Sequence, residues 1–298
     1  MAAVMPEGGA EEAKQSGCIA VVGGGTMGIG IAYVFAVAGF SVALVEPDDA
    51  RAIAVQLRLV ELAQAGVERG KLRREQADLA RQVQRLRSAA ELPHGLDLVI
   101  ETVPERLALK QQVLQEIASS QPKMIATNTS ALSIDVLAAS VTDATTFLGM
   151  HFFNPVWSLA MVELVRGQAT SAATLAAASA FVQAIDKTSI TVRDVPGFAT
   201  SRLDLIAALE AIRMLQDGVA SAEDIDKAMV IAYRHPIGPL RLSDIVGLDV
   251  RLDIARNLSL ALGERYAPPR LLEEMVARGE LGQKTGKGFF DWPPKAAV

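Results

Sequence analysis

The residues best suited to move a proton near neutral pH are histidines, and this chain of 298 residues has three of them. His94 lies in a Pro-His-Gly turn, and His235 precedes a proline in the C-terminal third. His151 instead lies near the end of the apolar run 146–153 and is followed closely by a turn-forming Asn-Pro pair. Ligands of open parallel sheets bind beyond the carboxyl ends of the strands. His151 is therefore the candidate general base, although a lone histidine can also be structural.

A histidine base needs a partner that orients its ring and stabilises the charge it acquires. Glu163 is the one charged residue inside the apolar run 161–165. A carboxylate in a buried strand requires a cationic or hydrogen-bonding neighbour. Pairing with His151 would explain both residues, whereas an ion pair with Arg166 is the structural alternative.

A polar cluster follows another apolar run, Met124–Thr127. Its last hydroxyl belongs to Ser130, which is a candidate donor to a substrate oxygen. The same cluster is equally consistent with a helix cap.

A phosphate-binding pattern lies near the N-terminus. Gly23, Gly25 and Gly28 form G-x-G-x-x-G directly after the apolar run Cys18–Val22, and a helix is expected over 26–38. The first glycine permits a tight turn, the second lets the backbone approach a pyrophosphate, and the third allows close helix packing. The helix N-terminus then offers N–H groups to the phosphates.

Three further residues complete this candidate nucleotide site. Thr26 and Met27 lie within the motif, with a helix cap as the alternative role for Thr26. Glu46 ends the next apolar run, 18 residues beyond Gly28, where an acid accepts hydrogen bonds from a ribose 2′-hydroxyl. A carboxylate there would repel a 2′-phosphate, so the sequence favours NAD over NADP and predicts no metal.

Composition excludes several classes of protein. The formal net charge of −5 argues against general nucleic-acid binding. The charge-free stretches 15–45 and 167–185 are long enough to span a membrane, but the first is rich in glycine and the second is weakly apolar, so no span is expected. Residues 1–16 lack the pattern of a signal peptide and are expected to form a disordered tail. A single cysteine, Cys18, fits the reducing cytoplasm, and we expect it to be buried and inert.

The pattern of elements changes once along the chain. From residue 18 to about 193, short apolar runs alternate with amphipathic helices, which predicts a mostly parallel Rossmann-type α/β sheet with helical layers. The run 189–192 is expected to be an edge strand, antiparallel to its neighbour. Beyond Pro196-Gly197 only helical patterns occur, so we predict a nucleotide-binding domain over 17–197 and an all-helical domain over 198–298.

A helical insertion is expected at about 50–87, and it is unusually basic. Residues 51–87 carry nine Arg or Lys against four acids. Such a segment is either a solvated helical face or an attractive surface for an anionic ligand.

Taken together, the motifs resemble the L-3-hydroxyacyl-CoA dehydrogenase family, of the single-function 3-hydroxybutyryl-CoA dehydrogenase type. The resemblance runs from about residue 18 to 292. It rests on motifs that occur in family order: Gly23–Gly28, Glu101–Glu105, Thr127–Ser130, His151–Pro155, Pro196–Phe198 and Gly282–Phe289.

The resemblance implies NAD-dependent oxidation of an L-3-hydroxyacyl-CoA to the 3-ketoacyl-CoA, and a homodimer formed through the helical domain. It implies that His151 is the base, that Glu163 supports it and that Ser130 contacts the reacting hydroxyl. It also implies that the basic insertion helps to bind CoA. Four further positions are implied to contact the cofactor or substrate: Glu105, Lys110, Asn154 and Lys284.

The sequence departs from the family pattern at several positions. Ser201 stands where the family typically has a catalytic asparagine, so its hydroxyl replaces a longer amide. Trp157 and Ala160 stand where Pro and Lys are common, and Ala131 replaces a frequent serine. Two alternatives therefore stay open: a related dehydrogenase of a non-CoA hydroxy acid, such as a sugar acid or carnitine, and a non-catalytic NAD-binding homologue.

Overall fold

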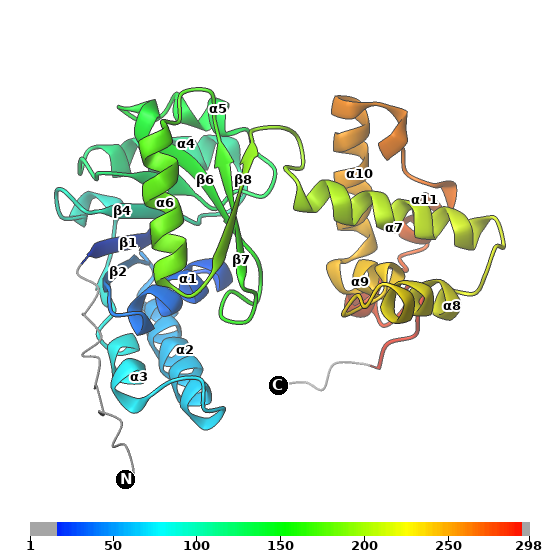
Figure 1. The fold of residues 1–298 in the computed structure, drawn as a ribbon, viewed down its shortest axis with the longest axis horizontal. Coiled ribbons are helices and arrows are strands. Elements are labelled where there is room, and N and C mark those ends of the chain that lie inside the picture. Colours follow the sequence, from blue (N-terminus) through cyan, green and yellow to red (C-terminus); the bar gives the residue numbers. More distant parts are fainter. Residues whose placement is uncertain (1–16, 294–298) are drawn as a thin grey trace, which may run out of the picture. The chain divides into compact units, whose positions relative to one another are not determined.

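The computed structural model describes residues 17–293, so the tail expected at 1–16 lies outside the described residues (Figure 1). The chain divides into two compact units between Asp194 and Val195. The first unit holds a single sheet with helices on both faces, and the second is built from helices (Figure 1). This confirms the predicted fold class. None of the described helices is long and apolar enough to cross a membrane.

The sheet of the first unit has eight strands in the order β3-β2-β1-β4-β5-β6-β7-β8. Neighbouring strands from β3 to β6 are all parallel. The chain adds strands on one side of β1 as far as β3 and then on the other side from β4 onward, so the strand order reverses between β1 and β4. Their bounds are β1 Cys18–Val22, β2 Ser41–Val45, β3 Gln84–Leu86, β4 Leu98–Glu101, β5 Ile125–Thr127, β6 Phe147–Phe152, β7 Met161–Arg166 and β8 Thr188–Arg193.

The strands at the two edges differ from the sequence prediction. The residues of β3 were expected to be helical, but they pair with β2 in parallel. Its Gln-Arg-Leu sequence has no apolar run, because an edge strand is exposed to solvent. Only its hydrogen bonds to β2 make this segment a strand, and the local sequence does not record them. At the other edge, β8 pairs in parallel with β7, not antiparallel as predicted. The reversal occurs one strand earlier, between β6 and β7, so β7 and β8 both run opposite to β1–β6.

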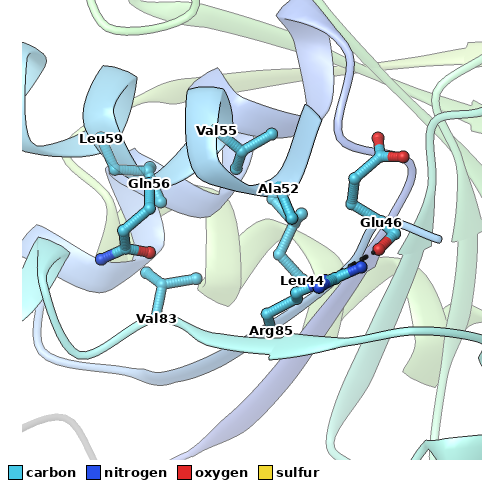
Figure 2. A pocket seen from close by; sticks show the side chains of 8 residues that line it. All are labelled: Leu44, Glu46, Ala52, Val55, Gln56, Leu59, Val83 and Arg85. Carbon is cyan, nitrogen blue, oxygen red and sulfur yellow. Dashed lines mark hydrogen bonds between the residues drawn. The ribbon is translucent and has the colours of Figure 1, made fainter. Parts of the chain in front are cut away.

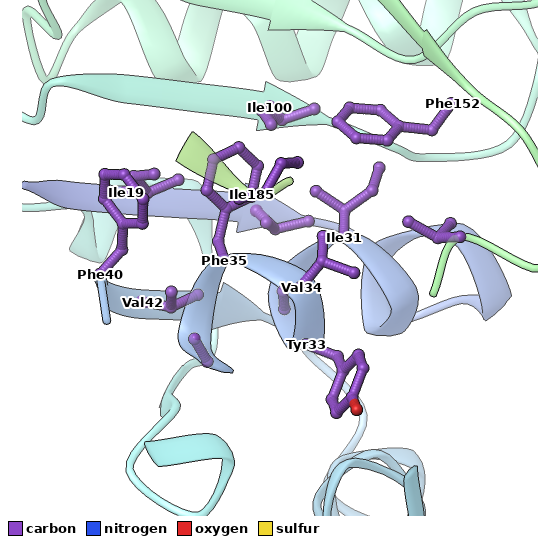
Figure 3. Packing of buried hydrophobic residues seen from close by; sticks show 14 of the residues in the cluster. Ile19, Ile31, Tyr33, Val34, Phe35, Phe40, Val42, Ile100, Phe152 and Ile185 are labelled. Carbon is purple, nitrogen blue, oxygen red and sulfur yellow. The ribbon is translucent and has the colours of Figure 1, made fainter. Parts of the chain in front are cut away.

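The helices of the first unit form two layers. α1 and α6 share a core on one face of the sheet, where Ile31, Phe35 and Ile185 meet Ile19 and Phe152 (Figure 3). α4 and α5 lie on the other face (Figure 1). The bounds are α1 Thr26–Val37, α2 Asp49–Glu68, α3 Arg74–Ala80, α4 Leu107–Ala118, α5 Ile134–Ala138 and α6 Ala172–Ala184.

Both faces of the central strands are therefore covered, which explains their continuous apolar runs. In β1 and β2, every residue after the first is buried. The first residue of β1 is Cys18, which is exposed, so the expectation of a buried cysteine was wrong. Its backbone N–H donates to Asp97 Oδ2 at 2.8 Å, because the chain has only just entered the sheet there.

The second unit contains α7 Thr200–Gln216, α8 Ala222–Lys227, a π-helical segment Ala228–Ala232, α9 Pro239–Val246, α10 Leu248–Leu262 and α11 Arg270–Ala277. Its core consists of leucines and other large apolar residues, among them Leu209, Leu240 and Leu272, which are fully buried. An apolar face on each helix points into this core, as expected for amphipathic helices of a globular unit.

Candidate active site

The glycine turn between β1 and α1 has the backbone geometry of a dinucleotide-binding turn. Gly23 adopts a φ of 118°, which L side chains rarely reach. A Cβ on Gly28 would lie 1.8 Å from the carbonyl oxygen of Gly23, so only glycine lets the helix approach the turn. A Cβ on Gly25 would meet no atom within 4 Å, which leaves this stretch of backbone accessible. Gly23 and Gly28 thus show the tight turn and the close helix packing predicted for them, and Gly25 leaves the open backbone that an approaching pyrophosphate would need.

The start of α1 supplies free amide donors to this turn. Gly25 is the N-cap and Thr26 the first helical residue, so the alternative of Thr26 as the cap was wrong. The first hydrogen bond of the helix runs from the Ile29 N–H to Gly25 O, at 2.9 Å. The N–H groups that precede Ile29 in the helix have no helical carbonyl to donate to. Thr26 is exposed and Met27 half-buried. Such an end fits the pyrophosphate of a dinucleotide.

Glu46 lies beside the glycine turn, directly after β2. A Cβ placed on Gly24 would be 2.6 Å from Glu46 Oε2, so the carboxylate and the turn are immediate neighbours. Glu46 Oε1 accepts from the Asp48 N–H at 3.1 Å, and Oε2 lies 3.6 Å from the Arg51 guanidinium. The carboxylate is therefore held in place where a ribose attached to the pyrophosphate would reach it.

His151 and Glu163 form a buried pair across the β6–β7 hairpin. The two residues are register partners in the antiparallel pairing, and His151 Nδ1 lies 2.8 Å from Glu163 Oε2. Glu163 is fully buried and His151 is 7% exposed. Residues three apart in a strand point to opposite faces, so Arg166 does not share the face of Glu163. The ring of Phe153 lies against the imidazole, with centroids 4.4 Å apart.

This arrangement assigns different tasks to the two imidazole nitrogens. An ionised carboxylate only accepts hydrogen bonds, so it favours the tautomer in which Nδ1 carries the hydrogen. The lone pair then lies on Nε2, which becomes the proton acceptor. The same carboxylate stabilises the imidazolium after proton uptake.

The polar segment after β5 links neighbouring strand ends. Asn128 Oδ1 accepts from the backbone N–H of Phe152 at 2.8 Å, which ties this segment to the strand that carries His151. Ser130 is exposed at the same edge, and its backbone N–H donates to Glu105. The N-cap of α5 is Ser133, so Ser130 does not cap this helix.

Glu105 organises the loop that contains Ser130. Its Oε1 accepts from Thr129 Oγ1 at 2.5 Å and from the backbone N–H groups of Ser130 and Ala131, both at 3.1 Å. Burial would raise the pKa of Glu105, but the Thr129 hydrogen bond, the charge of Lys110 and the two amides outweigh it and lower that pKa. Glu105 is therefore held as a carboxylate.

Lys110 is fully buried beneath this loop. Its ammonium donates to both carboxylate oxygens of Glu101, at 2.9 and 3.0 Å, and to Val103 O at 3.1 Å. It also lies 3.4 Å from Glu105 Oε2. Burial raises the pKa of Glu101, and the Lys110 charge and the Thr127 hydroxyl oppose that shift. Lys110 thus contacts the loop from below, and its predicted contact with the cofactor stays a prediction.

Three residues near the site were not singled out from the sequence. Thr102 Oγ1 donates to Val22 O at 3.1 Å and Gly23 O at 3.0 Å, and so supports the glycine turn from β4. Asn128 and Phe153, described above, are the other two. All three lie inside the motifs that carried the family resemblance, so the motifs themselves were the available signal.

The remaining candidates lie at the end of β6 and in the second unit. Asn154 is exposed just after the strand that holds His151. Ser201 is half-buried in the first turn of α7. The ammonium of Lys284 contacts both carboxylate oxygens of Asp249 at 2.5 Å, within the second unit.

Comparison with known proteins decides the family. The NAD-binding domain of 3-hydroxyacyl-CoA dehydrogenase matches residues 18–195, and the C-terminal domain of the same family matches residues 197–292. The chain belongs to the 3-hydroxyacyl-CoA dehydrogenase family. The predicted family, enzyme class and cofactor NAD are thereby confirmed.

Individual relatives agree over nearly the whole chain. A 3-hydroxybutyryl-CoA dehydrogenase of Mycobacterium tuberculosis is 38% identical and covers 92% of this chain and 98% of its own length. The human mitochondrial hydroxyacyl-coenzyme A dehydrogenase is 33% identical, with coverage of 92% and 90%. The crystal structure of (S)-3-hydroxybutyryl-CoA dehydrogenase from Ralstonia eutropha superposes with a TM-score of 0.88 at 38% identity, covering 93% of this chain and 99% of that one.

Proposed function

We propose that this 3-hydroxyacyl-CoA dehydrogenase oxidises an L-3-hydroxyacyl-CoA to the 3-ketoacyl-CoA, and catalyses the reverse reduction, with His151 as general base and acid. The observation that carries the assignment is the buried His151–Glu163 pair at the carboxyl end of β6. That edge of the sheet also carries the glycine turn and Ser130, so the turn suited to a nucleotide and the proton-accepting histidine lie at the same edge.

The residues of the first unit divide the chemistry among them. The glycine turn would hold NAD, which would supply an acceptor for the hydride of the carbon that bears the hydroxyl. His151 Nε2 removes the hydroxyl proton, and Glu163 stabilises the imidazolium that results. In the reverse direction, the imidazolium returns its proton to the developing alkoxide. The Ser130 hydroxyl donates to the reacting oxygen, and Phe153 excludes water from one side of the imidazole.

The substrate assignment to a CoA thioester rests on the basic insertion and on the relatives. Arg58, Arg69, Arg73 and Arg74 lie on or beside α2 and α3, where they suit the phosphates of CoA. In the second unit, Ser201 replaces the amide that the family resemblance implies, and its hydroxyl offers a single shorter contact to the substrate. Lys284 and Asn154 are assigned to cofactor or substrate contact.

The second unit is also the proposed dimer interface, in a cytoplasmic enzyme. It exposes large apolar side chains that a single copy leaves in water, among them Leu203, Ile231, Tyr233 and Leu260. Such exposed apolar surface is typical of protein–protein contacts. Light scattering at micromolar concentration is expected to give the mass of a dimer, and a monomeric mass would contradict this assignment.

The decisive experiment compares the wild type with His151→Gln. Consumption of NADH with acetoacetyl-CoA is expected to fall by about 10²-fold or more, because general base catalysis contributes this much. NADH binding, followed by nucleotide fluorescence, is expected to persist, because the glycine turn is untouched. Near-normal turnover of the variant would refute the role of His151.

A panel of substrates separates the alternatives. Acetoacetyl-CoA, longer 3-ketoacyl-CoAs and the corresponding free acids are assayed under the same conditions with the wild type. Turnover confined to the free acids would favour a dehydrogenase of non-CoA hydroxy acids. Binding of NADH without turnover of any of these compounds would favour a non-catalytic homologue.

A further inference from the structure

Three arginines gather where the ribose of a bound dinucleotide would lie, at the end of β2. Arg51 comes from the first turn of α2, Arg85 from β3, and Arg87 directly follows β3. Their guanidinium groups form ion pairs with two carboxylates, those of Glu46 and Asp49. Arg51 lies 3.6 Å from Glu46 Oε2, whereas Arg85 and Arg87 lie 2.6 and 3.4 Å from the same Asp49 oxygen.

Arg85 is held in place without help from any side chain at position 46. Its Nε donates to the backbone oxygen of Glu46 at 3.0 Å, and NH2 donates to Pro47 O at 3.3 Å. Figure 2 shows the Arg85 guanidinium at the backbone of Glu46, while the carboxylate of Glu46 points away from it. The pairing of Leu44 with Arg85 in the β2–β3 register fixes the base of this side chain as well.

The carboxylates of Glu46 and Asp49 therefore have different roles. Glu46 is 3% exposed, faces the glycine turn and is placed to accept from ribose hydroxyls. Asp49 is exposed and forms ion pairs with two guanidinium groups at once, which halves their combined charge. Three positive groups around a ribose would suit a 2′-phosphate, because arginine recognises phosphate through charge-assisted hydrogen bonds.

We propose that Asp49 is a second determinant of the preference for NAD over NADP. Glu46 repels a 2′-phosphate directly, and Asp49 pairs with Arg85 and Arg87 and so lowers the positive charge that they offer to such a phosphate. Removing Glu46 alone frees Arg51 but leaves the other two arginines paired. Removing both carboxylates exposes all three guanidinium groups on a scaffold that the backbone of residues 46 and 47 keeps in position.

The test measures dissociation constants of NADH and NADPH by nucleotide fluorescence for the wild type, Glu46→Ser, Asp49→Asn and the double variant. Asp49→Asn alone is expected to gain little NADPH affinity, because Glu46 still repels the phosphate. Glu46→Ser is expected to bind NADPH more tightly than the wild type. The double variant is expected to bind NADPH at least about tenfold more tightly than Glu46→Ser. The NADPH affinity of the double variant should also fall steeply with salt.

Two controls make the result specific. Asp78→Asn removes another exposed carboxylate, paired with Arg81 at 3.8 Å on α3, and should leave both affinities unchanged. Adding Arg85→Met to the double variant should abolish most of the gain in NADPH affinity. The proposal is overturned if the double variant binds NADPH no tighter than Glu46→Ser, or if adding Asp78→Asn to Glu46→Ser raises NADPH affinity as much as adding Asp49→Asn does.

The inference rests on nucleotide binding at the glycine turn, and not on the identity of the acyl substrate. Wild-type protein that binds NADH but oxidises no hydroxyacyl-CoA would contradict the proposed function and leave this test intact. A double variant that fails to gain NADPH affinity, in an enzyme that turns over acyl-CoA, would contradict only the role of Asp49.

Discussion

His151 and Glu163 lie directly opposite each other in the antiparallel β6–β7 pair, with Nδ1 and Oε2 2.8 Å apart. The hairpin that joins the strands brings the two side chains onto one face of the sheet at the carboxyl end of β6. Opposite residues of an antiparallel pair are the closest side-chain neighbours that a sheet provides. The reversal of β7 therefore creates the His151–Glu163 pair, because a parallel β7 would not return along the chain beside His151.

Glu163→Gln tests this pairing with little change in shape. The neutral amide cannot stabilise an imidazolium as a carboxylate does, and it can bond the ring in the wrong tautomer. We expect turnover to fall by about 10²- to 10⁴-fold, with NADH affinity retained. The pH–rate profile should shift as well. A variant whose pH–rate profile is that of the wild type would show that Glu163 acts only in packing.

Two glycines of the same motif should respond differently to alanine. In Gly28→Ala the new methyl group would collide with Gly23 O, so we expect a lowered melting temperature. In Gly25→Ala the methyl group meets no protein atom, and the φ of −78° accommodates alanine, so the fold should persist. The same methyl group would obstruct a pyrophosphate, which should weaken NADH binding by at least about tenfold. Equal loss of melting temperature in both variants would contradict this distinction.

The Glu105 carboxylate should contribute stability that depends on pH. Its pKa is lowered in the folded protein from the ordinary value of 4.5, so the folded state holds its proton less tightly than the unfolded chain. The contribution is full above pH 4.5 and is lost as the pH falls through the lowered folded-state pKa. Urea unfolding of the wild type and Glu105→Gln across this range should show the difference shrinking on acidification. A constant difference would contradict the prediction.

Lys110→Met should destabilise the first unit strongly. It leaves the fully buried carboxylate of Glu101 without its cationic partner, and breaking such a pair costs about 3–5 kcal/mol. Adding Glu101→Gln removes the uncompensated charge and should restore part of the free energy of unfolding. Urea denaturation measures both effects. If the double variant is no more stable than Lys110→Met, the Glu101 charge is not the cause.

Asp244 should hold the C-terminal segment of the second unit in place. This fully buried carboxylate accepts from the backbone N–H groups of Phe289 and Phe290, at 2.9 and 3.0 Å, and from Trp292 Nε1 at 2.8 Å. Asp244→Asn replaces one acceptor oxygen with a donor NH₂ group, so we expect the free energy of unfolding to fall by about 1–3 kcal/mol. In a Trp157→Phe background the fluorescence of Trp292 reports the change, because the chain has two tryptophans. Unaltered emission would refute this role.

Features that depend on neighbouring residues could be predicted from the sequence. A strand, a glycine turn and a helix follow one another within 18–37, so the dinucleotide motif could be located and the distinct roles of its three glycines assigned. Glu46 follows one apolar strand and His151 lies near the end of another, and the polarity of a parallel sheet then places both at one edge. The same local patterns also established the fold class.

Only the tertiary structure decided which distant residues meet. Strand β3 has no apolar pattern, and its pairing with β2 is what carries Arg85 and Arg87 to Asp49. Lys110 is a typical surface residue by type, yet Glu101 draws it into full burial. Hydrogen bonds between strands join residues far apart in the chain, so no local pattern records them. The sequence therefore determined where the nucleotide-binding motif begins, and the pairing of β3 and β7 determined which charges lie near Glu46 and His151.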